Sequence, residues 1–208
     1  MTDLGAPILN IEGELVALGP LRREHIPLYL RWINDFGTTR TLGVPPRPMT
    51  LEQETAWYEQ AAVNDARTGF TIYERATGRA VGNCGLHEMD LANRRTVVGI
   101  MIGEPDARGR GYGTEAMRLL LDYAFTVLGL HNVMLTVVEY NGAGRRCYEK
   151  VGFREMGRRR ESRWYNGHFW DEIHMDILTT EFTSPVLRRL LEPDVEEARS
   201  RGVEKNDG

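Results

Sequence analysis

Cysteine is nearly absent from this sequence: only Cys84 and Cys147 occur among its 208 residues. Two isolated thiols form neither a disulfide framework nor a four-cysteine metal site. No apolar run approaches the roughly 20 residues that span a bilayer, so no membrane association is predicted. The N-terminal segment lacks a basic start followed by a long apolar stretch, which argues against a signal peptide. We therefore expect a reduced, cytoplasmic protein.

An excess of positive charge is also missing. Lys and Arg number 26 against 30 Asp and Glu, which gives a net charge of −4. This balance argues against a nucleic-acid partner, and the basic run from Arg158 to Arg160 lies beside acidic residues, as in a solvated strand end. The five histidines show no spacing typical of metal ligands, so no metal is expected. A hydrophobic content of 41% is ordinary for a soluble chain with a sizeable core.

Hydrophobic periodicity, proline and glycine divide the chain into interspersed strands and helices. Thr50 to Gln53 has the form of a capping box, which predicts the start of a helix. Strands are expected over residues 14–18, 70–74, 80–88, 96–102, 132–138, 153–156 and 169–178. Helices are expected over residues 22–34, 50–64, 114–128 and 142–151. This order predicts an α/β fold, with a mixed sheet covered by helices on both faces.

The domain organisation is simple because no linker divides the chain. We expect one domain over residues 1–178 and a C-terminal extension over residues 179–208, with one short helix followed by a mobile tail. The last strand and residues 180–190 offer apolar surface beyond the domain, which suggests a homodimer.

The segment DARGRGYGTE, residues 106–115, follows a strand and opens a long helix. Alternating glycines let several backbone N–H groups point toward one place, where the positive end of the helix dipole also lies. Arg108 and Arg110 add positive charge, so the segment predicts a diphosphate site. It lacks the Gly-Lys-Ser/Thr of a Walker A loop and the spacing of a dinucleotide fingerprint. A glycine-rich connection without a ligand is the alternative.

A second feature lies about 30 residues further on. Asn141 follows a strand, where it would cap the next helix or contact a ligand amide. Tyr148 lies on that helix. A single tyrosine on a helix is more often a packing residue, and only its pairing with the glycine-rich segment favours a functional role.

These two features together resemble the GNAT family of acyl-CoA N-acyltransferases. The family motif Arg/Gln-x-x-Gly-x-Gly/Ala matches residues 108–113, and its later Asn…Tyr-Glu-Lys-x-Gly-Phe element matches residues 141–153. Residues 160–178 resemble the ending of a subgroup that includes ribosomal-protein N-terminal and spermidine N-acetyltransferases. The resemblance covers residues 12–178. It implies a GNAT fold, with about six to seven strands and a splayed strand pair that holds CoA.

The resemblance also implies acetyl-CoA as co-substrate and assigns roles to residues. The diphosphate would lie on the backbone N–H groups of Arg108, Gly109, Arg110, Gly111, Tyr112, Gly113 and Thr114. The pantetheine arm would lie between the splayed strands, on backbone groups of Met101 and Ile102 and on Asn141. An acceptor amine would attack the carbonyl directly, and Tyr148 would protonate the leaving thiolate.

The usual general base of the family is missing. Many relatives have Glu in the strand before the glycine-rich segment, near the position of Val97, where this sequence has no acid. Glu88, at the end of the preceding strand, is our candidate for the base. Further candidates are the acids Asp90 and Glu139, which are more often solvated surface residues, and His87, His168 and His174, because a single histidine is more often structural.

The acceptor is expected to be a primary amine, either a peptide or protein N-terminus or a small molecule such as a polyamine. Its pocket should lie between the first two helices and the last hairpin. The aromatic and acidic candidates for its walls are Trp32, Phe36, Trp57, Tyr58, Trp164, Tyr165, Trp170, Asp35, Glu54, Glu88, Asp171 and Glu172. Two alternatives are acetylation of an amine antibiotic or amino sugar, and a CoA-binding regulator without catalysis.

Overall fold

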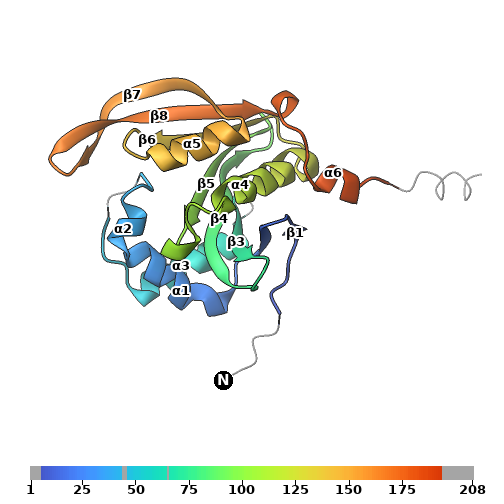
Figure 1. The fold of residues 1–208 in the computed structure, drawn as a ribbon, viewed down its shortest axis with the longest axis horizontal. Coiled ribbons are helices and arrows are strands. Elements are labelled where there is room, and N and C mark those ends of the chain that lie inside the picture. The colour runs from blue at the N-terminus through green and yellow to red at the C-terminus, as the bar shows by residue number, and fades with distance from the viewer. Residues whose placement is uncertain (1–5, 44–45, 65, 194–208) are drawn as a thin grey trace, which may run out of the picture.

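The computed structural model describes residues 6–43, 46–64 and 66–193. One mixed sheet of eight strands forms its centre, in the order β1-β2-β3-β4-β5-β6-β8-β7 (Figure 1). The strands are β1 (Ile11–Glu12), β2 (Val16–Pro20), β3 (Thr68–Glu74), β4 (Ala80–Asp90), β5 (Arg95–Ile102), β6 (Asn132–Val138), β7 (Arg154–Tyr165) and β8 (His168–Leu178). The helices are α1 (Ile26–Asn34), α2 (Phe36–Thr39), α3 (Leu51–Val63), α4 (Tyr112–Asp122), α5 (Gly142–Val151) and α6 (Leu187–Leu190). The strand beyond the expected six to seven is β1, a two-residue partner of β2.

The two faces of the sheet bury separate cores, because successive side chains of a strand point to opposite faces. On β3, Ile72 packs into the larger core together with α4, whereas Tyr73 packs into a smaller core with Tyr29 and Trp32 of α1. Trp57 of α3 packs against that smaller core. Helices α1 and α3 therefore cover the face opposite α4, as the predicted two-sided cover requires.

Strands β5 and β6 run parallel but pair over only three residues, Arg95–Val97 with Asn132–Met134. Beyond that point β5 continues against β4 as far as Ile102, and β6 continues against β8 as far as Val138. The two strands therefore diverge and leave backbone N–H and C=O groups along their facing edges. This divergence confirms the predicted splayed pair.

The central helix differs from its prediction at both ends. It begins at Tyr112 rather than at Thr114, because Gly111 adopts the left-handed conformation at the N-cap, and it ends at Asp122 in a π-helical turn, η3 (Tyr123–Val127). Asp122 is fully buried and accepts hydrogen bonds from the Thr126 hydroxyl at 2.8 Å and from two backbone N–H groups at the start of α6. The first part of the C-terminal extension is thus docked on the core, and the predicted mobile tail lies outside the described residues.

Strand β7 is much longer than the predicted 153–156. It runs to Tyr165 and pairs only with β8, so it forms one edge of the sheet. Most of its side chains are exposed, because an edge strand with little cover needs no apolar face. Its sequence therefore lacks the alternation that marks a half-buried strand. The capping box at Thr50 and Gln53, by contrast, is present as predicted.

Candidate active site

A cavity of about 690 Å³, here called the strand slot, lies where β5 and β6 diverge. Its walls include β5 from Val97 to Ile102, the glycine-rich loop before α4 and the start of α5. The predicted site residues that line it are Met101, Ile102, Arg108, Gly109, Gly111, Gly113, Thr114, Asn141 and Tyr148. The fold therefore brings both sequence motifs to one cavity.

The glycine-rich loop presents backbone donors to the slot. Gly109 and Gly111 have φ values of +71° and +87°, in the left-handed region that favours glycine. Within the described residues the backbone N–H groups of both lack a backbone acceptor, and the first N–H groups of α4 have no intrahelical acceptor. A side chain at Gly113 would point into the slot, toward Ile102 and Cys147. Several donors and the positive end of a helix dipole converge here, as a diphosphate site requires.

The side chain of Arg108 lines the slot and is hydrogen-bonded to neutral protein groups there. Its guanidinium donates to the Thr38 hydroxyl at 2.5 Å and to the carbonyl oxygens of Ile102 and Gly103, both at 3.2 Å. Arg108 thus ties the end of β5 to α2 along the slot wall. Its donation also occupies the Ile102 carbonyl that was expected to meet the pantetheine arm.

Arg110 and Tyr112 do not line the slot. Arg110 donates to Oε1 of Glu74 at 2.9 Å, and its guanidinium lies 4.8 Å from the centre of the Tyr112 ring. The Tyr112 hydroxyl donates to the same carboxylate oxygen at 2.5 Å. Both side chains therefore anchor the loop to β3 from outside the slot, which leaves only their backbone for the predicted diphosphate role.

Asn141 caps α5, one of the two roles considered for it. Its Oδ1 accepts from the Gly144 N–H at 2.9 Å, and its Nδ2 lies 3.5 Å from the Thr41 carbonyl oxygen. The residue still lines the slot. Its side chain is thus already engaged with protein groups at the place where the CoA arm was expected.

Tyr148 projects from α5 into the slot and is half-buried. Its ring packs edge-on against Phe153, with 6.1 Å between ring centres. Burial raises the pKa of the hydroxyl above its usual value, so the group keeps its proton at neutral pH. A proton donor in the slot is what the leaving thiolate needs.

Two basic residues that line the slot were not predicted from the sequence. Arg146 and Lys150 line it from α5. They are four residues apart, a spacing that places both on one face of a helix, and this was the signal available in the sequence. They add positive charge to that of Arg108, the loop arginine that lines the slot.

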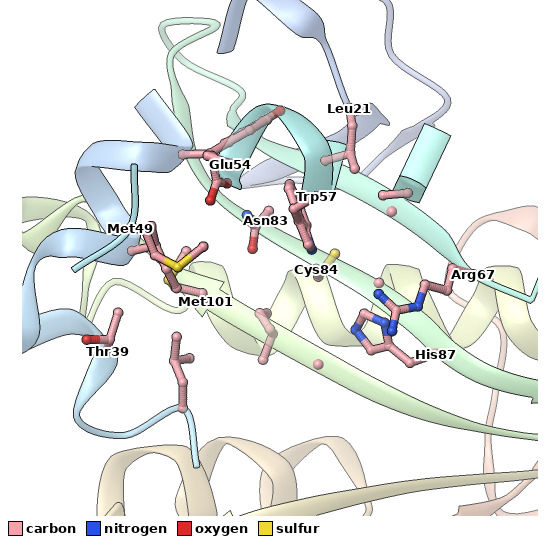
Figure 2. A pocket seen from close by; sticks show the side chains of 18 of the residues that line it. Leu21, Thr39, Met49, Glu54, Trp57, Arg67, Asn83, Cys84, His87 and Met101 are labelled. Carbon is pink, nitrogen blue, oxygen red and sulfur yellow. The ribbon is translucent and has the colours of Figure 1, made fainter. Parts of the chain in front are cut away.

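A second cavity, also of about 690 Å³, lies under α3 on the opposite face of the sheet and is here called the α3 cavity. It lies between α1 and α3 on one side and β3, β4 and β5 on the other (Figure 2). Trp57 and Ala61 of α3 line it, as do Tyr29 and Ile33 of α1. The first two predicted helices therefore do wall a pocket.

The floor of the α3 cavity is a row of glycines. Gly69 on β3 faces Gly85 on β4, which in turn faces Gly99 on β5. Three neighbouring positions without side chains leave the space that the cavity occupies, since interiors are otherwise closely packed. Only the strand register brings these glycines together, so the sequence alone does not reveal the row.

Glu54 is the one carboxylate in the described lining of the α3 cavity. Its side chain comes from α3 and is buried, and burial raises its pKa to about 7. Figure 2 shows it at the end of the cavity where Asn83 and Met101 lie. A carboxyl group that titrates near neutral pH is suited to accept a proton from an amine.

His87 and Arg67 lie at the other end of this cavity (Figure 2). Burial, reinforced by the Arg67 charge, lowers the pKa of the His87 imidazole. A Cβ placed on Gly99 would lie 3.2 Å from His87 Nε2, so the imidazole lies against the glycine row. This end of the α3 cavity thus has a neutral histidine beside an arginine.

The two cavities meet at β5. Four residues line both of them, Leu42, Gly99, Ile100 and Met101. A ligand in the strand slot and a second ligand in the α3 cavity would therefore approach each other across the same short stretch of β5. Such an arrangement suits a reaction between two substrates.

Several predicted residues lie elsewhere. Glu88 is exposed, has a φ of +51° in the irregular end of β4 and lines neither cavity. The other base candidates outside both linings are Asp90, Glu139, His168 and His174.

The last hairpin walls neither cavity, contrary to prediction, because it pairs on the far side of β6. Its tip residues Trp164 and Phe169 are exposed instead. Trp32 is in the core, where its indole N–H donates to Glu104 at 2.8 Å. Of the predicted acceptor-pocket residues, only Trp57 and Glu54 line the α3 cavity.

The described residues form neither a metal-binding cluster nor a membrane-spanning helix. Within residues 6–43, 46–64 and 66–193, no three His, Cys, Asp or Glu side chains gather closely enough to hold a metal ion. The same part of the chain forms no helix that is long and apolar enough to cross a membrane. Both cysteines are free thiols, Cys84 buried and Cys147 half-buried.

Known proteins match both the sequence and the fold. The family model described as acetyltransferase (GNAT) domain matches residues 16–154. The alpha/beta-tubulin-N-acetyltransferase 9 of Homo sapiens is 32% identical over 157 residues, 69% of this chain and 74% of that protein. The spermidine N(1)-acetyltransferase of Escherichia coli K12 is 28% identical over 167 residues, 80% of this chain and 88% of that protein.

Among solved structures, spermidine N-acetyltransferase from Vibrio cholerae, in complex with CoA and spermine, superimposes with a TM-score of 0.75. The likeness covers 81% of this chain and 98% of that one, at 24% identity. At this sequence identity, the structural likeness is evidence for the fold alone. With the matched family model, the diverging strands and the glycine-rich loop define a transferase that takes its acyl group from CoA. The chain belongs to the GNAT acetyltransferase family, and it is an acetyl-CoA-dependent N-acetyltransferase.

Proposed function

We propose that this enzyme acetylates a small-molecule or short-peptide amine, with acetyl-CoA in the strand slot and the acceptor in the α3 cavity. The observation that supports this assignment is the shared wall of the two cavities, Leu42 and Gly99 to Met101. The acetyl group would lie at this wall, where the amine reaches it from the other face of the sheet. Positioning of the two reactants is then the main contribution of the fold to catalysis.

Acetyl-CoA is held chiefly by backbone groups in this proposal. The N–H groups of Gly109 and Gly111 and of the first turn of α4 bind the diphosphate, and Arg146 and Lys150 add charge from α5. Strand β5 offers the edge that faces β6 to the pantetheine arm. Asn141 contributes by holding the start of α5 against the slot.

Tyr148 is the proposed general acid and Glu54 the proposed general base. Glu54 accepts a proton from the attacking amine, the nitrogen adds to the thioester carbonyl, and the C–S bond breaks as Tyr148 protonates the thiolate. No covalent enzyme intermediate is needed. The base thus comes from α3 rather than from β5, where Val97 occupies the position at which many relatives have Glu.

The pH dependence tests Glu54. Because burial raises its pKa to about 7, kcat should rise with pH through about 7 as the carboxylate form appears. Glu54→Gln should lower kcat by about 10²-fold or more and remove this rise. The same change should raise Tm near pH 8, because it removes a buried carboxylate without an ion-pair partner among the described residues.

Glu52→Gln is the matched control, since Glu52 is exposed on the same helix and lines neither cavity. It should leave both the pH profile and kcat unchanged. An unaltered pH profile in Glu54→Gln would assign the base elsewhere.

The relatives are named for tubulin, ribosomal and spermidine acceptors, so the acceptor must be found by experiment. Release of free CoA thiol from acetyl-CoA should be measured with short peptides, alkylamines, spermidine and aminoglycosides. We expect release with at least one class of amine. Clear binding of acetyl-CoA with no release from any class would contradict this proposal.

Two neighbouring substitutions test the acceptor cavity. Ala61→Trp fills it, because Ala61 lines it, whereas Ala62 is exposed and does not. We expect Ala61→Trp to lower turnover of the best amine at least tenfold with unchanged acetyl-CoA affinity, and Ala62→Trp to behave as wild type. Equal turnover in both variants would show that the amine binds elsewhere.

We also propose a cytoplasmic location, since acetyl-CoA is the co-substrate. The proposed catalytic domain spans residues 1–178 and depends on the docked part of the extension.

A homodimer is a further proposal. Its predicted surface is reduced, because Leu187 is buried against the core and Phe182 packs on Phe125. Leu190 and Leu191 supply exposed apolar surface instead, and sedimentation would measure the association.

A further inference from the structure

The charges around the α3 cavity are unbalanced toward positive. Glu54 is the one carboxylate in its described lining, and it lies in the interior. Arg47 and Arg67 also line the cavity and are exposed, so they lie at its mouth. An amine that enters therefore passes two guanidinium groups and meets one carboxylate.

Glu54 and Arg67 lie at opposite ends of the α3 cavity. Figure 2 shows Glu54 and Asn83 at one end of the cavity and Arg67 and His87 at the other. Asn83 and His87 are four residues apart on β4, which corresponds to about 13 Å along a strand. Glu54 and Arg67 thus lie on the order of 10 Å apart.

The space between these ends is apolar. Its floor is the row of Gly69, Gly85 and Gly99, and Trp57 covers it from α3. This middle region offers van der Waals contact and no counter-charge, and a charged group placed there would lose its hydration without gaining a partner. Only an uncharged chain suits it.

We infer that the acceptor is a small amine with one ammonium group at one end and an anionic group, a carboxylate or a phosphate, about 10 Å away at the other, joined by an apolar chain. The ammonium meets Glu54 beside the shared wall with the strand slot. The anionic group meets Arg67 and the N–H of His87. A tripeptide with apolar side chains has these features, because three extended residues span about 10 Å. The inference rests on the proposed role of the α3 cavity as the acceptor site.

A polyamine fits this cavity poorly. Its second ammonium group would lie over the apolar floor or against Arg67, where desolvation and like charge both oppose it. The similarity to spermidine N-acetyltransferases therefore extends to the fold and the CoA site, and the charges of the acceptor cavity differ from what spermidine requires.

Four amines of equal length test this inference: 8-aminooctanoate, an aminoalkyl phosphate, octylamine and 1,8-diaminooctane, with spermidine as a fifth. Near pH 8, kcat/KM should be highest for the two anionic amines, intermediate for octylamine, and at least tenfold lower for the diamine and spermidine. The two anionic arms distinguish a carboxylate from a phosphate. A preference for the diamine or spermidine, or no turnover of any of these amines, would overturn the inference.

Charge reversal supplies the second measurement. Arg67→Glu should reduce the ratio of kcat/KM for 8-aminooctanoate over 1,8-diaminooctane at least tenfold, whereas Arg159→Glu, on exposed β7 and outside both cavities, should not change it. An unchanged ratio in Arg67→Glu would also overturn the inference. If the enzyme prefers the diamine and Ala61→Trp abolishes its turnover, the α3 cavity is still the acceptor site and only the inference about charge fails. If Ala61→Trp blocks no amine, the proposed function itself fails.

Discussion

Replacing Tyr148 with Phe is expected to lower kcat by about 10²-fold or more, the usual contribution of a general acid. The ring and its contact with Phe153 are retained, so the slot keeps its shape. Only the proton donor is lost, and acetyl-CoA should bind with unchanged affinity. Steady-state kinetics measure kcat, and calorimetry measures the dissociation constant of acetyl-CoA.

Tyr123→Phe is the matched control for this change. Tyr123 is a half-buried tyrosine that packs edge-on against Phe70 and lines neither cavity. The Tyr123→Phe enzyme should retain full turnover. If Tyr148→Phe also retains full turnover, Tyr148 is a packing residue of α5 and the thiolate takes its proton from water.

Replacing Gly109 with Val should weaken acetyl-CoA binding by about 10²-fold or more. Gly109 has a φ of +71°, and a β-branched residue at that position forces the loop out of its conformation. The loop N–H groups would then no longer converge on the diphosphate. Two lost hydrogen bonds to a charged group, at about 1.5–3 kcal/mol each, account for a change of this size.

Gly78→Val separates this effect from backbone strain. Gly78 has a φ of +70° in the turn between β3 and β4, and neither glycine has a neighbouring atom within 4 Å of an added Cβ. Both substitutions should therefore cost about 1–2 kcal/mol of stability, measured as a shift in Tm. Only Gly109→Val should change the affinity for acetyl-CoA. Equal affinity in both variants would remove the glycine-rich loop from the binding site.

In the proposed mechanism, catalysis combines groups from both faces of the sheet. Tyr148 lies in the strand slot, and Glu54 lies in the α3 cavity. Glu54 would take a proton from the amine in the α3 cavity, and Tyr148 would give another proton to the thiolate in the strand slot, on the other side of the shared wall of Gly99 to Met101. Here the burial of one carboxylate on a helix supplies a group with a pKa of about 7.

Local sequence was sufficient to predict the part of the site made by the backbone. The alternating glycines determine the conformation of the loop before α4, because Gly109 and Gly111 have positive φ values that glycine tolerates best. The start of α3 was also predictable from neighbouring residues, because its capping box joins Thr50 to Gln53, three residues further on. The order of strands and helices followed from periodicity and predicted a mixed α/β sheet, whereas the family fold was predicted from the resemblance of residues 108–113 and 141–153 to the family motifs. Each of these features depends on neighbours within a few residues.

The tertiary structure decided where side chains point and which distant residues meet. Arg110 turns to Glu74, 36 residues away, because a buried carboxylate requires a partner. The register of β3, β4 and β5 aligned Gly69, Gly85 and Gly99 into one floor. Packing of α3 over that floor buried Glu54 and raised its pKa. Long-range pairing and burial produced the α3 cavity, and neither leaves a local pattern in the sequence.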